Sequence, residues 1–421
     1  MGKNKDQLSP IAVWALAAGG MVGGGIYTVL GVVIAVAGEW SWLSFLIIGI
    51  LAITSAYSYV FLANMFNENG GAFAFLEKVK DKNLAGNISW LLILGYVFTI
   101  SVYAFAFGHY VSFAFHGSPM TIRVLAALIV VALIGLNLAG VGKLTKVEIA
   151  IVSVNLLALL ALSVYGLANW DATQLTAGIE PKPIYSSLVG GAAIFMAYEG
   201  FQLLTYEYDK IREPQKNFMP VLISAVVFVV LLYIVVAVGA TMLGGAIAMI
   251  EYKEIALSIA AGNALGNTGV VLMTVAAGFA TAAAINSTLY STANLSKNIA
   301  KNKELPSWFS KTNSHDVPAR SIIILGGFAG LLAVIGSLSS LVEGASLIFL
   351  CTFGIVNWIA YRESQTKQWI PALGVSIAII IALALIFRLA VSKPVILGAM
   401  VIVILLIVLG RPFLLSKTKK A

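Results

Sequence analysis

The chain has 421 residues, of which 60% are hydrophobic and only 10% are charged. A soluble protein of this length needs far more polar surface, so the composition excludes a soluble fold and indicates a polytopic membrane protein. The net charge of +8 is better explained by basic loops on one side of a membrane than by affinity for nucleic acid, and no nucleic-acid partner is expected.

Twelve segments are apolar and long enough to cross a bilayer, which requires about 20 residues of helix. They predict an all-α chain that forms a single transmembrane domain within the lipid bilayer. The first segment is too long and too rich in glycine for a signal peptide, so we expect it to be retained. In chain order the segments are 10–37, 40–65, 84–115, 121–140, 146–168, 185–208, 218–245, 268–299, 321–340, 343–361, 369–390 and 394–412.

The distribution of basic residues supports this count. With the N-terminus inside, twelve crossings place 21 of the 26 lysine and arginine residues in inside segments. The five that fall elsewhere are Arg123, Lys182, Lys253, Arg388 and Lys393. This asymmetry follows the positive-inside rule, so it predicts a multi-pass protein of the cell (inner) membrane with both termini in the cytoplasm.

The first segment is interrupted near its middle by three consecutive glycines. In hydrocarbon no water replaces lost backbone hydrogen bonds, so unwound backbone persists only where it lines a cavity or is buried in protein. The N–H groups at the start of the outer half-helix attract a carboxylate, helped by the helix dipole. Tight helix packing is the alternative, but packing needs small residues spaced by four. We therefore expect substrate to bind at Val22-Gly23-Gly24-Gly25-Ile26.

The sixth segment is interrupted at Tyr198-Glu199-Gly200-Phe201. An ionisable residue at membrane mid-depth is costly and is by default a functional candidate. Glu199 is expected to bind a substrate ammonium or to exchange protons. The alternative is that it caps N–H groups freed by the break. Phe195, Tyr198 and Phe201 are expected to form apolar walls and a lid, although each also suits simple packing.

Paired interruptions five helices apart indicate a transporter built from inverted repeats. The predicted repeats are 1–168 and 185–361, and 369–412 supplies two extra peripheral helices that suit a scaffold or a homodimer contact. A channel would need repeated rings of carbonyl or charged groups, which the sequence does not show. A sensor of the same fold that does not transport would look identical. Phosphate-binding loops, zinc-protease helices and nucleophile elbows are missing, so we expect no enzyme activity, metal or cofactor.

Several motifs resemble those of the amino acid–polyamine–organocation superfamily. Val22 to Tyr27 resembles its G-S/A-G-I-F signature, and Phe195 to Phe201 resembles its F-x-x-Y/F-x-G-F motif. Three shorter matches are Gly70-Gly71-Ala72-Phe73, Asp209 to Lys216, and Leu305-Pro306. The matches keep the family's order over about three quarters of the chain. The resemblance implies the leucine-transporter fold and an amino acid, polyamine or related organic cation as substrate.

The same resemblance bears on energy coupling. Some members place a lysine on helix five where this chain has Asn155, and sodium-coupled relatives use a hydroxyl on helix eight where it has Ala283, with Thr281 nearby. Gln202 stands where some antiporters carry an acid. These departures disfavour the two common coupling modes, one through the lysine on helix five and the other through a sodium ion at helix eight. Exchange, facilitated movement and proton coupling through Glu199 remain, and a sodium site is weakened rather than excluded.

Together these features predict a secondary transporter that moves amino acids or related amines by alternating access. The alternatives are a polyamine or organic-cation permease, or an amino acid exchanger without ion coupling.

Overall fold

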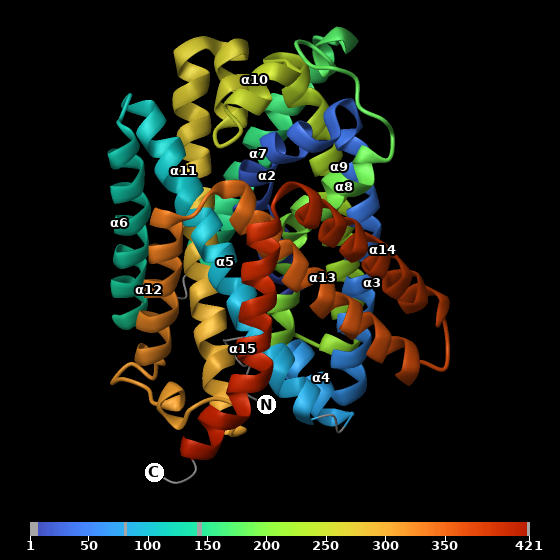
Figure 1. Ribbon diagram of the computed structural model, residues 1–421, viewed down its shortest axis with the longest axis vertical. Helices are drawn as coiled ribbons and strands as arrows, with labels where there is room; N and C mark the ends of the chain where they lie inside the picture. Colours follow the sequence, from blue (N-terminus) through green and yellow to red (C-terminus); the bar gives the residue numbers. More distant parts are fainter. Residues whose placement is uncertain (1–6, 80–81, 141–144, 419–421) are drawn as a thin grey trace.

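The structure, a computed structural model, describes residues 7–79, 82–140 and 145–418. Within these ranges the chain is helical, and the only extended pairing is an isolated bridge between Leu8 and Ile211. Most of the helices run side by side along the long axis of the molecule (Figure 1). In chain order they are α1 (Pro10–Val22), α2 (Gly25–Ala37), η1 (Gly38–Trp40), α3 (Ser41–Phe66), α4 (Gly71–Lys78), α5 (Lys82–Ala114), α6 (Pro119–Leu138), α7 (Thr145–Ala168), η2 (Ala172–Leu175), α8 (Ser186–Ile194), η3 (Phe195–Tyr198), η4 (Phe201–Lys210), α9 (Pro214–Gly244), α10 (Ala246–Glu251), α11 (Ala256–Lys301), η5 (Ser307–Ser310), α12 (Ala319–Ile335), α13 (Leu338–Glu363), α14 (Trp369–Ser392) and α15 (Pro394–Thr418).

Ten stretches of the described chain are long and apolar enough to cross a membrane. One of them, Pro10–Phe66, contains α1, α2 and α3, and α12 is not among the ten because it has only 17 residues. The all-α membrane architecture is confirmed. The count of twelve crossings and the division into repeats stay predictions.

Both predicted helix breaks are present. The first segment divides into α1 and α2 at Gly24, whose φ of −136° and ψ of −18° are not helical. The sixth segment consists of α8, η3 and η4, and Glu199 and Gly200 separate its last two parts. Its second half is therefore a 3₁₀ helix, which the sequence did not indicate.

Four predicted boundaries differ from the helix ends by five residues or more: the start of α11, the end of α12, the start of α13 and the end of α15. Helix α11 begins twelve residues before the predicted start at 268, and it passes through a kink at Gly266, which has a φ of +61°. Helix α12 ends at Ile335, not at 340, because Gly336 and Ser337 are extended. The N–H of Gly336 closes α12 with a hydrogen bond to the Leu332 carbonyl, and α13 then starts at Leu338.

The sixth predicted segment, which we call helix six and which consists of α8, η3 and η4, lies at the centre of the bundle. Helices α6 and α15 lie at its edge. Buried residues make up 83% of the most apolar part of Ser186–Lys210, but only 11% of the corresponding parts of Pro119–Leu138 and Pro394–Phe413. Figure 1 shows α6 at the left edge and α15 in front of α5. The peripheral position of α15 agrees with the prediction for the last helix.

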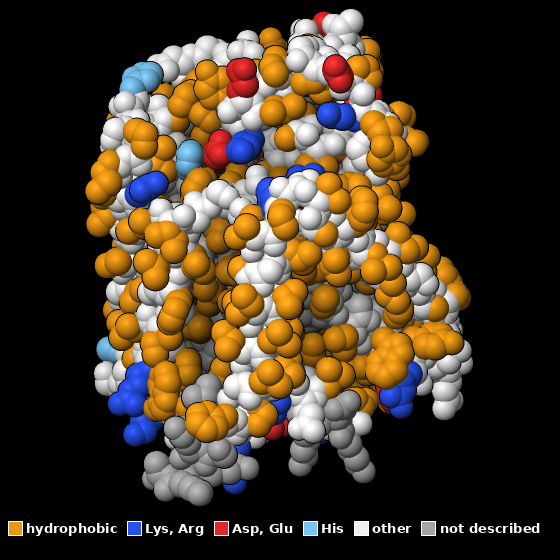
Figure 2. Space-filling model, viewed as in Figure 1, with side chains coloured by type: hydrophobic (Ala, Val, Ile, Leu, Met, Phe, Trp, Pro, Cys, Tyr) orange, Lys and Arg blue, Asp and Glu red, His pale blue; other side chains and the backbone are white. Residues whose placement is uncertain are grey.

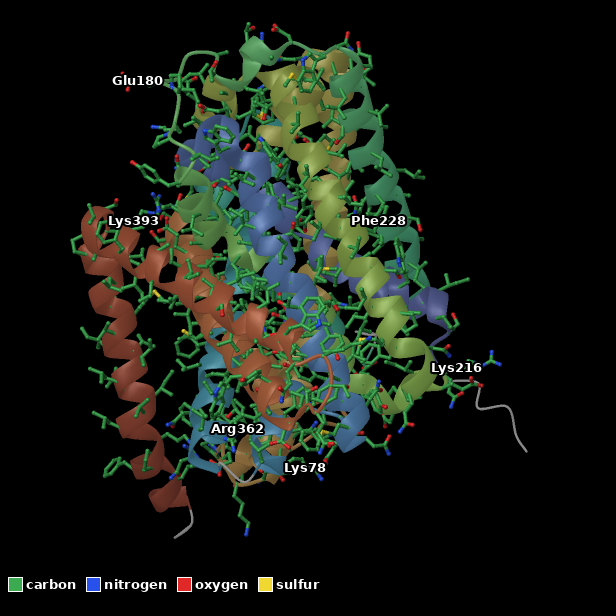
Figure 3. The ribbon with its side chains drawn as sticks, turned by 90° about the vertical axis from the view of Figure 1, so that its right-hand side faces the viewer. Lys78, Glu180, Lys216, Phe228, Arg362 and Lys393 are labelled. Carbon is green, nitrogen blue, oxygen red and sulfur yellow. The ribbon has the colours of Figure 1, made fainter. Side chains whose placement is uncertain are left out.

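The segment before α1 is tied to the end of η4. The Leu8 N–H donates to the Lys210 carbonyl at 2.7 Å, and the Arg212 N–H donates to the Leu8 carbonyl at 3.1 Å. The start of helix one and the end of helix six are thus joined by main-chain hydrogen bonds. Figure 3 shows Lys78, Lys216 and Arg362 toward one end of the molecule and Glu180 at the other.

Two of the basic residues that departed from the charge pattern, Arg388 and Lys393, have a structural explanation. Their side chains lie 3.1 and 2.8 Å from the two carboxylate oxygens of Glu343. Glu343 is fully buried in α13, so this ion-paired cluster anchors α14 to the bundle. The sequence alone does not identify Glu343 as a buried carboxylate.

Candidate substrate site between two broken helices

The break in helix one is stabilised from within its own segment. The Gly23 N–H donates to the Gly19 carbonyl at 2.7 Å, which ends α1. Beyond the break, the Thr28 hydroxyl lies 2.9 Å from the Gly24 carbonyl and 2.8 Å from the Gly25 carbonyl. Thr28, which the sequence analysis did not single out, therefore provides a hydrogen bond to carbonyls at the break.

The break in helix six is stabilised by side chains from two helices. Gly200 has a φ of +129°, a conformation that favours glycine, and its N–H donates to Gln202 Oε1 at 2.9 Å. On the other side of the break, Ser346 of α13 accepts the Met196 N–H at 3.1 Å and donates to the Ala193 carbonyl at 3.0 Å. These contacts replace part of the helical hydrogen bonding that the break removes.

The break in helix six lies directly against helix one, one turn before the break in helix one. A Cβ atom added to Gly200 would lie 2.3 Å from the carbonyl carbon of Gly20, so only glycine fits at this contact. Tyr233 of α9 bridges the two helices, since its hydroxyl lies 2.8 Å from the Met21 carbonyl and 3.0 Å from the Ala197 carbonyl. The structure therefore brings the two predicted interruptions together.

Glu199 is 2% exposed and incompletely paired. Its Oε1 accepts a hydrogen bond of 3.0 Å from Gln202 Nε2, and its Oε2 has no partner in the described part of the chain. The N–H of Gly200 is capped by Gln202, not by Glu199. A buried carboxylate without a cation is costly, so its free oxygen marks a position where a polar or cationic ligand is favoured.

Tyrosines surround Glu199. The hydroxyls of Tyr59 (α3) and Tyr103 (α5) are buried without a partner among the described residues, and both side chains lie near Glu199. Tyr96 accepts a hydrogen bond of 3.3 Å from Gln202 and lies 2.7 Å from the hydroxyl of Tyr206. This cluster was not predicted from the sequence, because tyrosine inside an apolar helix carries no local signal of what it faces.

Tyr103 also lies against the break in helix one. A Cβ atom on Gly24 would lie 2.2 Å from its ring, so glycine at this position permits the close approach. The ring of Tyr103 thus covers the interrupted backbone, while its hydroxyl remains available for a ligand.

The remaining predicted site residues are all buried, but not all of them face the break. Val22 and Ile26 flank the interruption in helix one, at 1% and 0% exposure. Phe195 packs its ring 5.4 Å from that of Phe353 in α13. Tyr198 donates its hydroxyl to the Phe45 carbonyl in α3 at 3.0 Å. Their roles as an apolar wall and lid stay predictions.

Two of the three coupling-site equivalents share a small cavity. Asn155 and Ala283 line a space of about 30 Å³ together with Gly20 and Gly23. Here helix one (α1) meets helix five (α7) and helix eight (α11). Thr281 does not line this cavity, and its hydroxyl bonds to the Ala277 carbonyl of its own helix at 2.7 Å. Any role of Asn155 and Ala283 in coupling stays a prediction.

Comparison with known proteins identifies the family. Residues 8–411 match the model of the family described as "Amino acid permease". An uncharacterized protein of Methanocaldococcus jannaschii is 30% identical over 73% of this chain and 72% of its own length. The inner membrane transport protein YbaT of Escherichia coli is 28% identical over 84% of this chain and 83% of its own length. Cationic amino acid transporter 4 of Arabidopsis thaliana is 25% identical over 83% of this chain and 62% of its own length.

A solved structure confirms the predicted fold. The crystal structure of MhsT in complex with L-phenylalanine aligns with a TM-score of 0.62, at 15% sequence identity, over 92% of this chain and 99% of that chain. The chain belongs to the amino acid permease family of the amino acid–polyamine–organocation superfamily and has the leucine-transporter fold.

Proposed function

We propose that this permease is a secondary transporter that moves amino acids or related amines across the membrane by alternating access. The observation that carries the proposal is the contact between two broken helices beside a buried, incompletely paired Glu199. Interrupted helices of this kind in corresponding parts of two halves point to a substrate site at the repeat interface.

The site suits a substrate that carries both a carboxylate and an ammonium. The carboxylate would bind at the start of α2, near Gly23-Gly24-Gly25, where the helix dipole is positive. The ammonium would bind at carbonyls beside the breaks and at the free Oε2 of Glu199. Burying either charge alone costs on the order of several kcal/mol, so both ends of the substrate need a partner in the site.

A permease for polyamines or other organic cations is the second candidate. It is supported by the Glu199 carboxylate and by the aromatic rings of Tyr59 and Tyr103, since aromatic faces and a carboxylate attract cations. A substrate that lacks a carboxylate would leave the start of α2 without an anion. Competition between an amino acid and its decarboxylated amine therefore separates the two candidates.

For coupling, we propose exchange, facilitated movement or proton coupling through Glu199. Asn155 cannot carry a proton, and Ala283 offers no oxygen on its side chain to a sodium ion. A third candidate is therefore an amino acid exchanger without ion coupling.

Transport by the purified protein in liposomes tests the proposal. The panel contains neutral amino acids, basic amino acids, the amines derived from them by decarboxylation, and polyamines, each with empty liposomes as the control. Uptake that requires the same solute inside indicates exchange, and uptake that follows an imposed pH gradient indicates proton coupling. Failure of every amino acid and amine to be taken up, to compete for binding or to raise the melting temperature would contradict the proposal.

We further propose that the protein resides in the inner membrane with both termini in the cytoplasm. The positive-inside distribution supports this orientation. The name of the Escherichia coli relative, an inner membrane transport protein, supports the location.

A further inference from the structure

The membrane-facing surface is hollowed on either side of α15 (Figure 2). The larger hollow, which we call the α12–α15 groove, has a volume of about 560 Å³ and lies between α5, α12, α15 and the loop Leu305–Phe309. Every side chain that lines it is apolar. A second hollow of about 240 Å³, between α5, α13 and α15, shares Leu94 and Val403 with the groove. The two hollows therefore adjoin along α15.

Side-chain contacts hold the loop at one mouth of the groove in place. Trp90 of α5 donates its ring N–H to the Glu304 carbonyl at 2.8 Å, and Ser321 of α12 donates to the Phe309 carbonyl at 3.1 Å. The Glu304 carboxylate is paired with Arg411 near the end of α15. The mouth is thus fixed to all three helices that form the groove.

The same mouth carries exposed cations. Lys303 lies two residues before the lining residue Leu305, and Lys311 lies two residues after Phe309. Arg320 lies one helical turn before Ile324, which also lines the groove. All three cations are exposed, and in the described ranges none of them has an ion pair. In Figure 2, blue side chains gather below the lower end of α12.

We propose that the α12–α15 groove binds one acyl chain of an anionic glycerophospholipid, whose phosphate is held by Lys303, Lys311 and Arg320. The groove lies on the lipid-facing surface and offers only apolar contacts, so an acyl chain suits it better than a polar solute. The basic mouth supplies charge complementarity to an anionic headgroup, and basic pockets between transmembrane helices bind such headgroups. A zwitterionic phosphatidylcholine, which carries no net charge, has no comparable advantage at this mouth.

Native mass spectrometry of the purified full-length protein tests this proposal. The protein is exchanged into detergent micelles that contain equal amounts of dioleoyl phosphatidylglycerol and dioleoyl phosphatidylcholine. We expect selective retention of phosphatidylglycerol and a rise in melting temperature when it is added. Equal retention of the two lipids would overturn the proposal.

Variants at the mouth test the role of the cations. Replacing Lys303, Lys311 and Arg320 with glutamine should weaken phosphatidylglycerol retention by about fivefold for each cation removed. The matched control replaces Arg212, Lys216 and Lys367, three exposed cations outside the groove, with glutamine and should leave retention unchanged. Equal retention by the test and control variants would overturn the assignment of the headgroup site.

Variants within the groove test the acyl-chain site. Ile324→Trp and Ile407→Trp enlarge two lining residues and should reduce retention, whereas Leu157→Trp on the exposed face of α7 should not. Dimers that dissociate in the two groove variants, without any retained lipid, would assign the surface to a second copy of the chain and overturn the proposal.

Discussion

The side chain of Gln202 donates a 3.0 Å hydrogen bond to the Glu199 carboxylate, and its own oxygen accepts the Gly200 N–H at 2.9 Å. One side chain therefore caps the broken helix and also orients the buried acid. The sequence left open whether Glu199 binds a ligand or caps the broken helix. Because Gln202 provides the cap, mutation can test ligand binding and capping separately.

Glu199→Gln should abolish a preference for cationic ligands and leave the fold intact. The free Oε2 can be replaced by an amide nitrogen while the remaining oxygen still accepts the Gln202 hydrogen bond. Loss of a charged hydrogen bond should weaken binding of a cationic ligand by about tenfold or more relative to a neutral one. Affinities for both ligands and the melting temperature are measured, with Glu251→Gln as the exposed control. Unchanged selectivity with a lost melting transition would make Glu199 a structural residue.

Gln202→Ala should instead lower stability, because it leaves the buried Gly200 N–H without its partner. An unsatisfied buried donor costs about 1–3 kcal/mol. Thermal unfolding in detergent compares this variant with Gln215→Ala, which removes an exposed amide at the start of α9. Equal melting temperatures for the two variants would show that the cap contributes nothing.

Gly200→Ala should abolish transport. The new Cβ would lie 2.3 Å from the Gly20 carbonyl carbon and would also strain a φ of +129°. Gly327→Ala in α12 is the matched control, since its Cβ meets nothing within 4 Å. Liposome uptake and melting temperature are both measured. Wild-type uptake by Gly200→Ala would show that the close contact of Gly200 with helix one is dispensable.

Glu343→Gln should destabilise the fold without altering substrate selectivity. The substitution removes the negative charge that pairs with Arg388 and Lys393, and breaking a buried pair costs about 3 kcal/mol or more. Glu180→Gln at an exposed position should have no effect on the melting temperature. A melting temperature equal to that of the control would mean that the cluster does not anchor α14.

Accessibility of introduced cysteines tests the orientation in the membrane. The chain has one cysteine, Cys351, which Cys351→Ala removes. In that background Lys182→Cys should react with an impermeant reagent from outside intact cells, and Lys210→Cys should react only after permeabilisation. Reaction of both positions from the same side would contradict the predicted topology, because the positive-inside rule places them on opposite sides.

The two helix breaks could be predicted because their signals are local. A run of three glycines and a lone carboxylate in an apolar segment are visible without any knowledge of neighbouring helices. The partners of the breaks were not predictable, since Tyr103, Tyr233 and Ser346 come from α5, α9 and α13, and similar polar residues occur throughout these helices. Glu343 was missed for another reason. It was placed at the first residue of a predicted segment, whereas α13 begins five residues earlier and buries it.

The Tyr233 hydroxyl between the two breaks has one proton and two carbonyl acceptors. At any instant it therefore donates a linear hydrogen bond either to Met21 in helix one or to Ala197 in helix six. A movement of a few tenths of an ångström between the half-helices changes which carbonyl is nearer. The position of this single proton thus reports the relative displacement of helix one and helix six, and Tyr233→Phe would remove that link without changing the shape of the packing.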